Sequence, residues 1–86
     1  MYEVKLSSKA QRFYEKADAP LVRKLNRCFD QLAKAPYIHP NIKRLRGELT
    51  GYFRYRVGDW RVVYEVNENH VVVIVLMIAH RRDIYR

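Results

Sequence analysis

The chain has 86 residues, and its 17 Lys and Arg outnumber nine Asp and Glu to give a formal net charge of +8. This length fits one domain over residues 1–86, which has room for only a modest core and favours a surface site over a large internal cofactor cavity. A field of this sign attracts polyanions, of which nucleic acid is the first candidate and an acidic protein the second. The plain alternative is a basic protein whose charge serves solubility alone.

Disulfides and membrane segments are disfavoured by the sequence. Cys28 is the single cysteine, which excludes a disulfide framework and a cysteine-based metal cluster and predicts a packing role on a helix. The longest apolar run, residues 71–79, is too short to cross a bilayer as a helix. The first nine residues carry charges where a signal peptide has its apolar core. We therefore expect a cytoplasmic protein without a membrane partner.

A strand and two helices are predicted in the first half of the chain. Residues 2–6 alternate like a short strand, and Ser8 with Gln11 has the spacing of a capping box that begins a helix. Pro20 suits the first turn of a second helix, which Pro36 ends. The second helix has an apolar stripe of Leu21, Leu25, Cys28, Phe29 and Leu32. Its opposite face carries four cations, Arg23, Lys24, Arg27 and Lys34.

Three strands are predicted in the second half, at residues 52–57, 60–67 and 71–80. Two-residue turns join them at Gly58-Asp59, which suits a type II′ turn, and at Glu68-Asn69. The fold class is therefore α+β with the order β-α-α-β-β-β. A helical hairpin should pack on one face of a small, mostly antiparallel sheet.

Basic side chains concentrate ahead of these strands and along the first two of them. Lys43, Arg44 and Arg46 form the densest positive stretch, either as a solvated face or as a phosphate contact. The Gly58-Asp59 turn pairs Arg56 with Arg61 and Arg54 with Val63, so these three arginines share one face. The other face then presents the apolar ladder Phe53, Tyr55, Val57, Trp60, Val62 and Tyr64.

Arg56 directly across from Arg61 is unfavourable for stability, which suggests a site for an anion. Guanidinium groups match phosphate geometry and stay charged at physiological pH, whereas the alternative is a solvated polar face. Continuing the register through the second turn places Ile74, Leu76, Ile78 and His80 on the arginine face. The final "HRRDIYR" adds Arg81, Arg82 and Tyr85 beside it, with His80 suited to proton transfer and Tyr85 to base stacking.

The element order, "KRLRG", "YRVGDWRVVYEV" and "HRRDIY" together resemble the RelE/ParE toxin superfamily, and more narrowly its RelE-type mRNA interferases. The resemblance covers nearly the whole chain. It implies a toxin that uses no metal or cofactor and cleaves mRNA in the ribosomal A site by attack of the 2′-hydroxyl on the adjacent phosphate. It also implies a cognate antitoxin, for which the charge suggests an acidic or amphipathic helix.

The resemblance also implies roles for individual residues. Arg61 would stabilise the charged phosphorane, Arg81 would assist the leaving oxygen, and Tyr85 would orient the substrate nucleotide. Arg54 and Arg56 stand where well-known members have lysines; since arginine does not lose its proton, they would bind phosphate, and His80 becomes the candidate base. Further phosphate contacts are expected from Lys43, Arg44, Arg46 and Arg82.

Two other functions remain open at this stage. A ParE-like chain would have the same fold but would inhibit DNA gyrase. A non-catalytic RNA- or ribosome-binding module would need the basic face without His80 or Tyr85.

Overall fold

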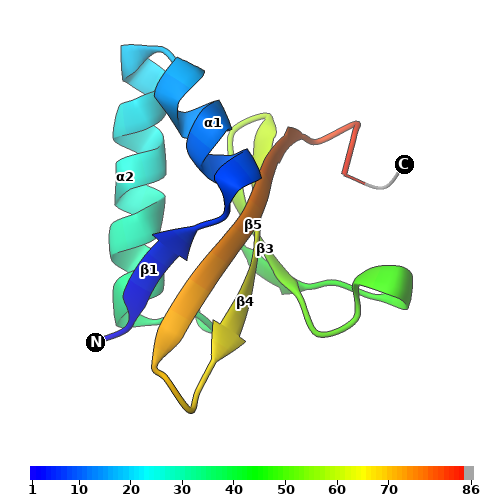
Figure 1. Ribbon diagram of the computed structural model, residues 1–86. Helices are drawn as coiled ribbons and strands as arrows, with labels where there is room; N and C mark the ends of the chain where they lie inside the picture. Colours follow the sequence, from blue (N-terminus) through cyan, green and yellow to red (C-terminus); the bar gives the residue numbers. More distant parts are fainter. Residues whose placement is uncertain (85–86) are drawn as a thin grey trace.

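The computed structural model describes residues 1–84, in which five strands form one mixed sheet ordered β1-β5-β4-β3-β2 (Figure 1). In chain order the elements are β1 (Glu3–Leu6), α1 (Ser8–Lys16), α2 (Ala19–Lys34), β2 (Ile42–Arg44), the 3-10 helix η1 (Gly47–Leu49), β3 (Phe53–Val57), β4 (Trp60–Asn67) and β5 (Val72–His80). The α+β class and the mostly antiparallel sheet are confirmed, since β1–β5 is the one parallel pairing in this sheet. The order gains a strand, because β2 includes part of the basic stretch, to which the sequence assigned no secondary structure.

Both helices begin at side-chain caps. The Ser7 hydroxyl accepts from the Ala10 N–H at 3.1 Å, so α1 is capped one residue earlier than the sequence predicted. The Asp18 carboxylate accepts from the Leu21 N–H at 3.0 Å, and Pro20 lies in the first turn of α2. Within residues 1–84, neither helix is both long and apolar enough to span a bilayer.

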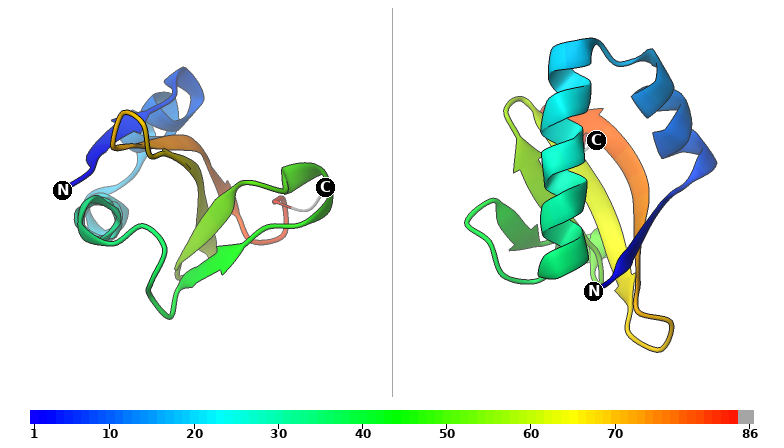
Figure 2. Two further views of the ribbon diagram at one scale, coloured as in Figure 1. Left: turned by 90° about the horizontal axis from the view of Figure 1, so that it is seen from below. Right: turned by 90° about the vertical axis from the view of Figure 1, so that its left-hand side faces the viewer.

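The helical hairpin covers one face of the sheet, as Figures 1 and 2 show. Fully buried Leu25 and Leu32 of α2 pack there with Val62, Tyr64 and other residues of the predicted apolar ladder. We call the opposite side of the sheet the open face. The C-terminal turn and η1 lie on this side (Figure 1).

The predicted β3–β4 register is confirmed residue by residue. Val57 pairs with Trp60, Arg56 with Arg61 and Arg54 with Val63. Gly58 leads the turn at φ 59°, the positive value that a type II′ turn requires at its first central residue. Because glycine has no Cβ, it adopts this conformation without steric cost. The three arginines therefore leave their strands on the open face.

The predicted placement of Ile78 and His80 on that face is wrong. Val63 pairs with Met77 and Tyr64 with Val75, so Leu76 is an extra residue in a β-bulge. One extra residue reverses the alternation of every residue beyond it. Ile78 therefore enters the main core and His80 lies across from Trp60 on the helix side.

The β4–β5 connection is longer than the predicted two-residue turn. Asn67 pairs with Val72, which leaves residues 68–71 as a four-residue turn. Val71 closes it at φ 53°, an unfavourable conformation for a β-branched side chain. Because the turn is longer by two residues, Ile74 keeps its predicted place on the open face, opposite Glu65.

Candidate nucleic-acid interface

Arg61 and Arg81 both contact the β3–β4 turn. Arg61 Nη1 donates to the carbonyl oxygens of Gly58 at 2.8 Å and Trp60 at 3.0 Å. From the C-terminal turn, the Arg81 backbone N–H donates to the Asp59 carbonyl at 2.8 Å. Arg81 Nε also lies 3.7 Å from Asp59 Oδ1. Two arginines that are 20 positions apart in the sequence are thus held at one turn.

The Arg81–Asp59 ion pair leaves Arg81 accessible to another anion. The two side chains are 64% and 66% exposed, and ion pairs this exposed contribute only about 0–1 kcal/mol. An anionic ligand can therefore replace Asp59 at little cost. The sequence did not identify Asp59 as a partner, because its pairing depends on where the tail turns after β5.

Arg54 and Arg56 are positioned by Asn41, a residue that the sequence analysis did not single out. Arg54 Nη1 and the Arg56 backbone N–H both donate to the Asn41 carbonyl, at 2.7 Å and 3.0 Å. Arg56 Nη2 lies 3.4 Å from Asn41 Oδ1. These acceptors are neutral, so the contacts fix the guanidinium groups without cancelling their charge.

The basic stretch before β3 divides between the two faces. Lys43 pairs with Arg54 and shares the open face with it. Arg44 pairs with Phe53 instead, and its guanidinium carbon lies 5.7 Å from the centre of that ring in a cation–π contact. The structure therefore does not bring Arg44 to the open-face arginines.

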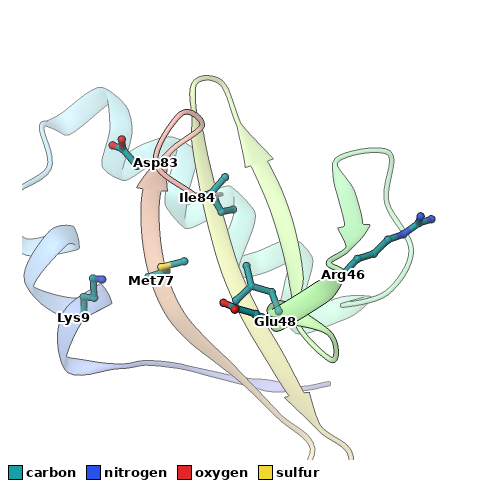
Figure 3. A pocket seen from close by; sticks show the side chains of 7 residues that line it. Lys9, Arg46, Glu48, Met77, Asp83 and Ile84 are labelled. Atoms are coloured by element: carbon teal, nitrogen blue, oxygen red, sulfur yellow. The ribbon is translucent and has the colours of Figure 1, made fainter. Parts of the chain in front are cut away.

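The C-terminal turn packs on the open face through a second, smaller core. Ile84, Leu45 and Val63 are buried together, with Leu49, Tyr52 and Met77 against them. Beside this core is a cleft of about 450 Å³ (Figure 3), within the usual range for ligand sites. Its lining includes Lys9 and Arg46, and also the acids Glu48 and Asp83. Arg46 extends away from Met77 and Ile84 in Figure 3.

His80 contacts Trp60 and the backbone of the C-terminal turn. Its ring meets Trp60 edge-on at 5.4 Å between centroids, and its Nδ1 accepts from the Arg82 backbone N–H at 3.3 Å. The Asp83 N–H donates to the His80 carbonyl at 2.8 Å. These contacts anchor the turn that carries Arg81 and Arg82, the latter exposed. Tyr85 lies outside the described residues.

Cys28 has the packing role predicted for it. The side chain is 1% exposed in the main core, and burial raises the pKa of its thiol. A thiol in this environment is a poor nucleophile. Within residues 1–84, no three or more His, Cys, Asp and Glu side chains are grouped so that they could hold a metal ion.

Comparison of the sequence with known families identifies the class of protein to which this fold and cationic hairpin belong. The family described as the ParE toxin of type II toxin–antitoxin systems, parDE, matches residues 4–85. The chain therefore belongs to the RelE/ParE superfamily of type II toxin–antitoxin toxins.

Individual relatives agree with this membership. Toxin RelG of Mycobacterium tuberculosis is 46% identical over 44 residues, and the alignment spans 51% of each chain, so it reaches only about half of that relative. A chain of the M. tuberculosis RelBE2 toxin–antitoxin complex is 28% identical with a TM-score of 0.79, over 93% of this chain and 98% of that one. A chain of the Pyrococcus horikoshii RelE–RelB complex is 26% identical with a TM-score of 0.81, over 95% and 97%.

Proposed function

We propose that this toxin is a ribosome-dependent, metal-independent mRNA endonuclease that cleaves the messenger in the ribosomal A site. The observation that carries the proposal is that Arg61 and Arg81 both contact the β3–β4 turn. Two fixed cations around one phosphate stabilise the negative charge that develops during cleavage, which is often the dominant catalytic contribution. The ribosome would supply the alignment of the RNA.

In the proposed reaction, the messenger's 2′-oxygen forms a bond to the adjacent phosphorus and the bond from phosphorus to the 5′-oxygen breaks. The 2′-hydroxyl proton passes to water, and the 5′-oxygen takes a proton from water as it leaves. The products are a 2′,3′-cyclic phosphate and a 5′-hydroxyl. Arg61 stabilises the phosphorane and Arg81 the leaving oxygen, while Tyr85 orients the nucleotide.

The other cations on the open face would hold the RNA backbone on either side of the reacting phosphate. Arg54 and Lys43 pair across β2 and β3, and Asn41 fixes the guanidinium of Arg54. Arg56, Arg46 and Arg82 would make further phosphate contacts. Arg44 is the weakest member of the predicted set, because it lies over Phe53.

The sequence made His80 the candidate proton acceptor, and the position of His80 in the fold changes that assignment. Its Nδ1 already accepts the Arg82 N–H, and its ring lies against Trp60 on the helix side of the sheet, whereas Arg61 leaves β4 on the open face. We therefore assign His80 to positioning the C-terminal turn. In that case the 2′-hydroxyl proton passes to water.

A cognate antitoxin would hold the toxin inactive in the cytoplasm, where the ribosomes are. The structures of RelBE2 and of the archaeal RelE–RelB pair are toxin–antitoxin complexes, which supports an antitoxin partner for this chain. The net charge of +8 favours an acidic or amphipathic segment as the inhibitor.

Inhibition of DNA gyrase is the second candidate, because the matching family is described by its ParE toxins. Purified ribosomes that carry a defined messenger, with a codon in the A site, distinguish the two activities. The nuclease cuts that messenger at the A-site codon and leaves the same RNA intact without ribosomes, and the Arg61→Ala/Arg81→Ala double variant does not cut. Intact messenger together with inhibited gyrase supercoiling contradicts the proposal.

A further inference from the structure

A second cationic cleft lies between α2 and the β3–β4 hairpin. It encloses about 270 Å³ and is lined by Lys24 and Arg27 of α2 on one side and by Asn41 and Arg56 on the other. Arg56 borders the cleft from β3, although the β3–β4 register directs its side chain to the open face. It adjoins a cleft of about 450 Å³, with which it shares Lys24, Val57 and Gly58. Figure 2 shows α2 running alongside the strands here, on the side of the sheet away from the C-terminal turn.

The positive charge of this cleft is not balanced locally. Lys24 and Arg27 are one helical turn apart and exposed on the same face of α2. No carboxylate lines the smaller cleft, and neither ion pair found within residues 1–84 involves its three cations. In the adjoining cleft, Asp18 caps α2 and Asp59 pairs with Arg81.

The lining offers charge and hydrogen-bond donors but little apolar surface. Its apolar side chains, Cys28, Tyr55 and Val57, are only 1%, 8% and 7% exposed. An amphipathic protein helix needs apolar pockets for its anchoring side chains, which this cleft lacks. A phosphodiester backbone needs cations and room for close approach. Gly58 provides that room, since a Cβ built on it would meet no atom within 4 Å.

We propose that the cleft of Lys24, Arg27 and Arg56 binds an RNA phosphodiester backbone while the toxin is on the ribosome. The inference rests on the proposed ribosome-dependent function. Arg56 links this cleft to the reaction site, because it lines the cleft and also pairs directly with Arg61 across the hairpin. The bound backbone belongs either to ribosomal RNA or to a more distant part of the messenger.

The test compares Lys24→Gln/Arg27→Gln with the control Arg12→Gln/Lys34→Gln. The control removes one arginine and one lysine that are exposed on the helices but line neither cleft. Affinity is measured at several salt concentrations for vacant ribosomes and for ribosomes carrying a messenger. For the cleft variant we expect binding at least fivefold weaker, with a salt slope smaller by about 1.4 for two lost phosphate contacts. The control should change affinity less than twofold.

The cleavage rate at saturating ribosome should be unchanged in the cleft variant, because Arg61 and Arg81 are intact. Weaker binding to vacant ribosomes assigns the backbone to ribosomal RNA, and weaker binding only with a messenger assigns it to the messenger. The inference is overturned if the control variant loses as much affinity for ribosomes as the cleft variant does. It is also overturned if the cleft variant binds ribosomes as wild type does and binds only the antitoxin more weakly. If wild-type toxin binds ribosomes but does not cut the messenger, only the proposed nuclease activity is contradicted. The comparison of ribosome affinities still tests the cleft.

Discussion

Replacement of Arg61 by alanine separates the chemistry of the site from the stability of the fold. Arg61 stands directly across from Arg56, and such like-charge pairs cost about 0.2–1 kcal/mol. Its hydrogen bonds to the Gly58 and Trp60 carbonyls contribute in the opposite direction, with a net value of about 1 kcal/mol each. These contributions partly cancel, so we expect the free energy of unfolding to fall by only about 1 kcal/mol. For a domain of this size, that lowers the Tm by about 4–8 °C.

The effect on catalysis should be much larger. Removal of one fixed donor to a developing negative charge slows comparable reactions by about 10²–10³-fold. Arg61→Lys keeps the charge but loses the planar fork that the two carbonyls orient, so its rate should lie between those of wild type and Arg61→Ala.

The assay is single-turnover cleavage of a messenger on saturating ribosomes, well below the Tm of every variant. A ribosome-binding measurement on the same samples serves as the control for docking. A rate for Arg61→Ala within threefold of wild type contradicts the role given to this residue. So does a large loss of rate that is fully explained by unfolded protein in thermal melts.

Four further substitutions test separate features. Tyr64→Phe removes a buried hydroxyl that donates to the Pro36 carbonyl at 2.6 Å, so denaturant titration should show a loss of about 1–3 kcal/mol in the free energy of unfolding. A loss below about 0.5 kcal/mol, which is close to the error of such titrations, contradicts the value given to that bond. Glu68 accepts hydrogen bonds from the hydroxyls of Tyr37 and Tyr2, and these bonds lower the pKa of its carboxyl. Wild type should therefore be more stable than Glu68→Gln near neutral pH and should lose that advantage as the pH falls below about 4. A difference in stability that does not change with pH contradicts this. Val71→Asn should raise the Tm, because asparagine tolerates the positive φ at an exposed site, and an unchanged or lower Tm argues against strain there. His80→Gln should slow cleavage by the same factor at every pH if His80 positions the turn, whereas a change in the shape of the pH–rate profile indicates a proton acceptor.

Features that depend on neighbouring residues were predicted well from the sequence. The β3–β4 register followed from Gly58-Asp59, because a two-residue turn and strict alternation determine every pair in the hairpin. Pro20 likewise marked the start of α2, since its fixed φ suits the first turn of a helix. The apolar stripe of α2 and the ladder on β3 and β4 then gave the main core.

Features that depend on distant residues were not predicted. Nothing in the composition of β5 distinguishes Leu76 as the bulged residue, because every neighbouring position is also apolar. The face of His80 depends on that bulge and was therefore assigned wrongly. Asn41 and Ile84 were missed for a similar reason: each acts on residues brought close only by the folded sheet.

The most direct measurement is the mapping of mRNA ends in cells after brief induction of the toxin, combined with an assay for gyrase-dependent DNA breaks. The account predicts new 5′-hydroxyl ends within codons of translated regions and no excess of DNA breaks. Induction of Arg61→Ala should produce neither new mRNA ends nor DNA breaks. Growth arrest with intact messengers, or with DNA breaks in their place, contradicts it.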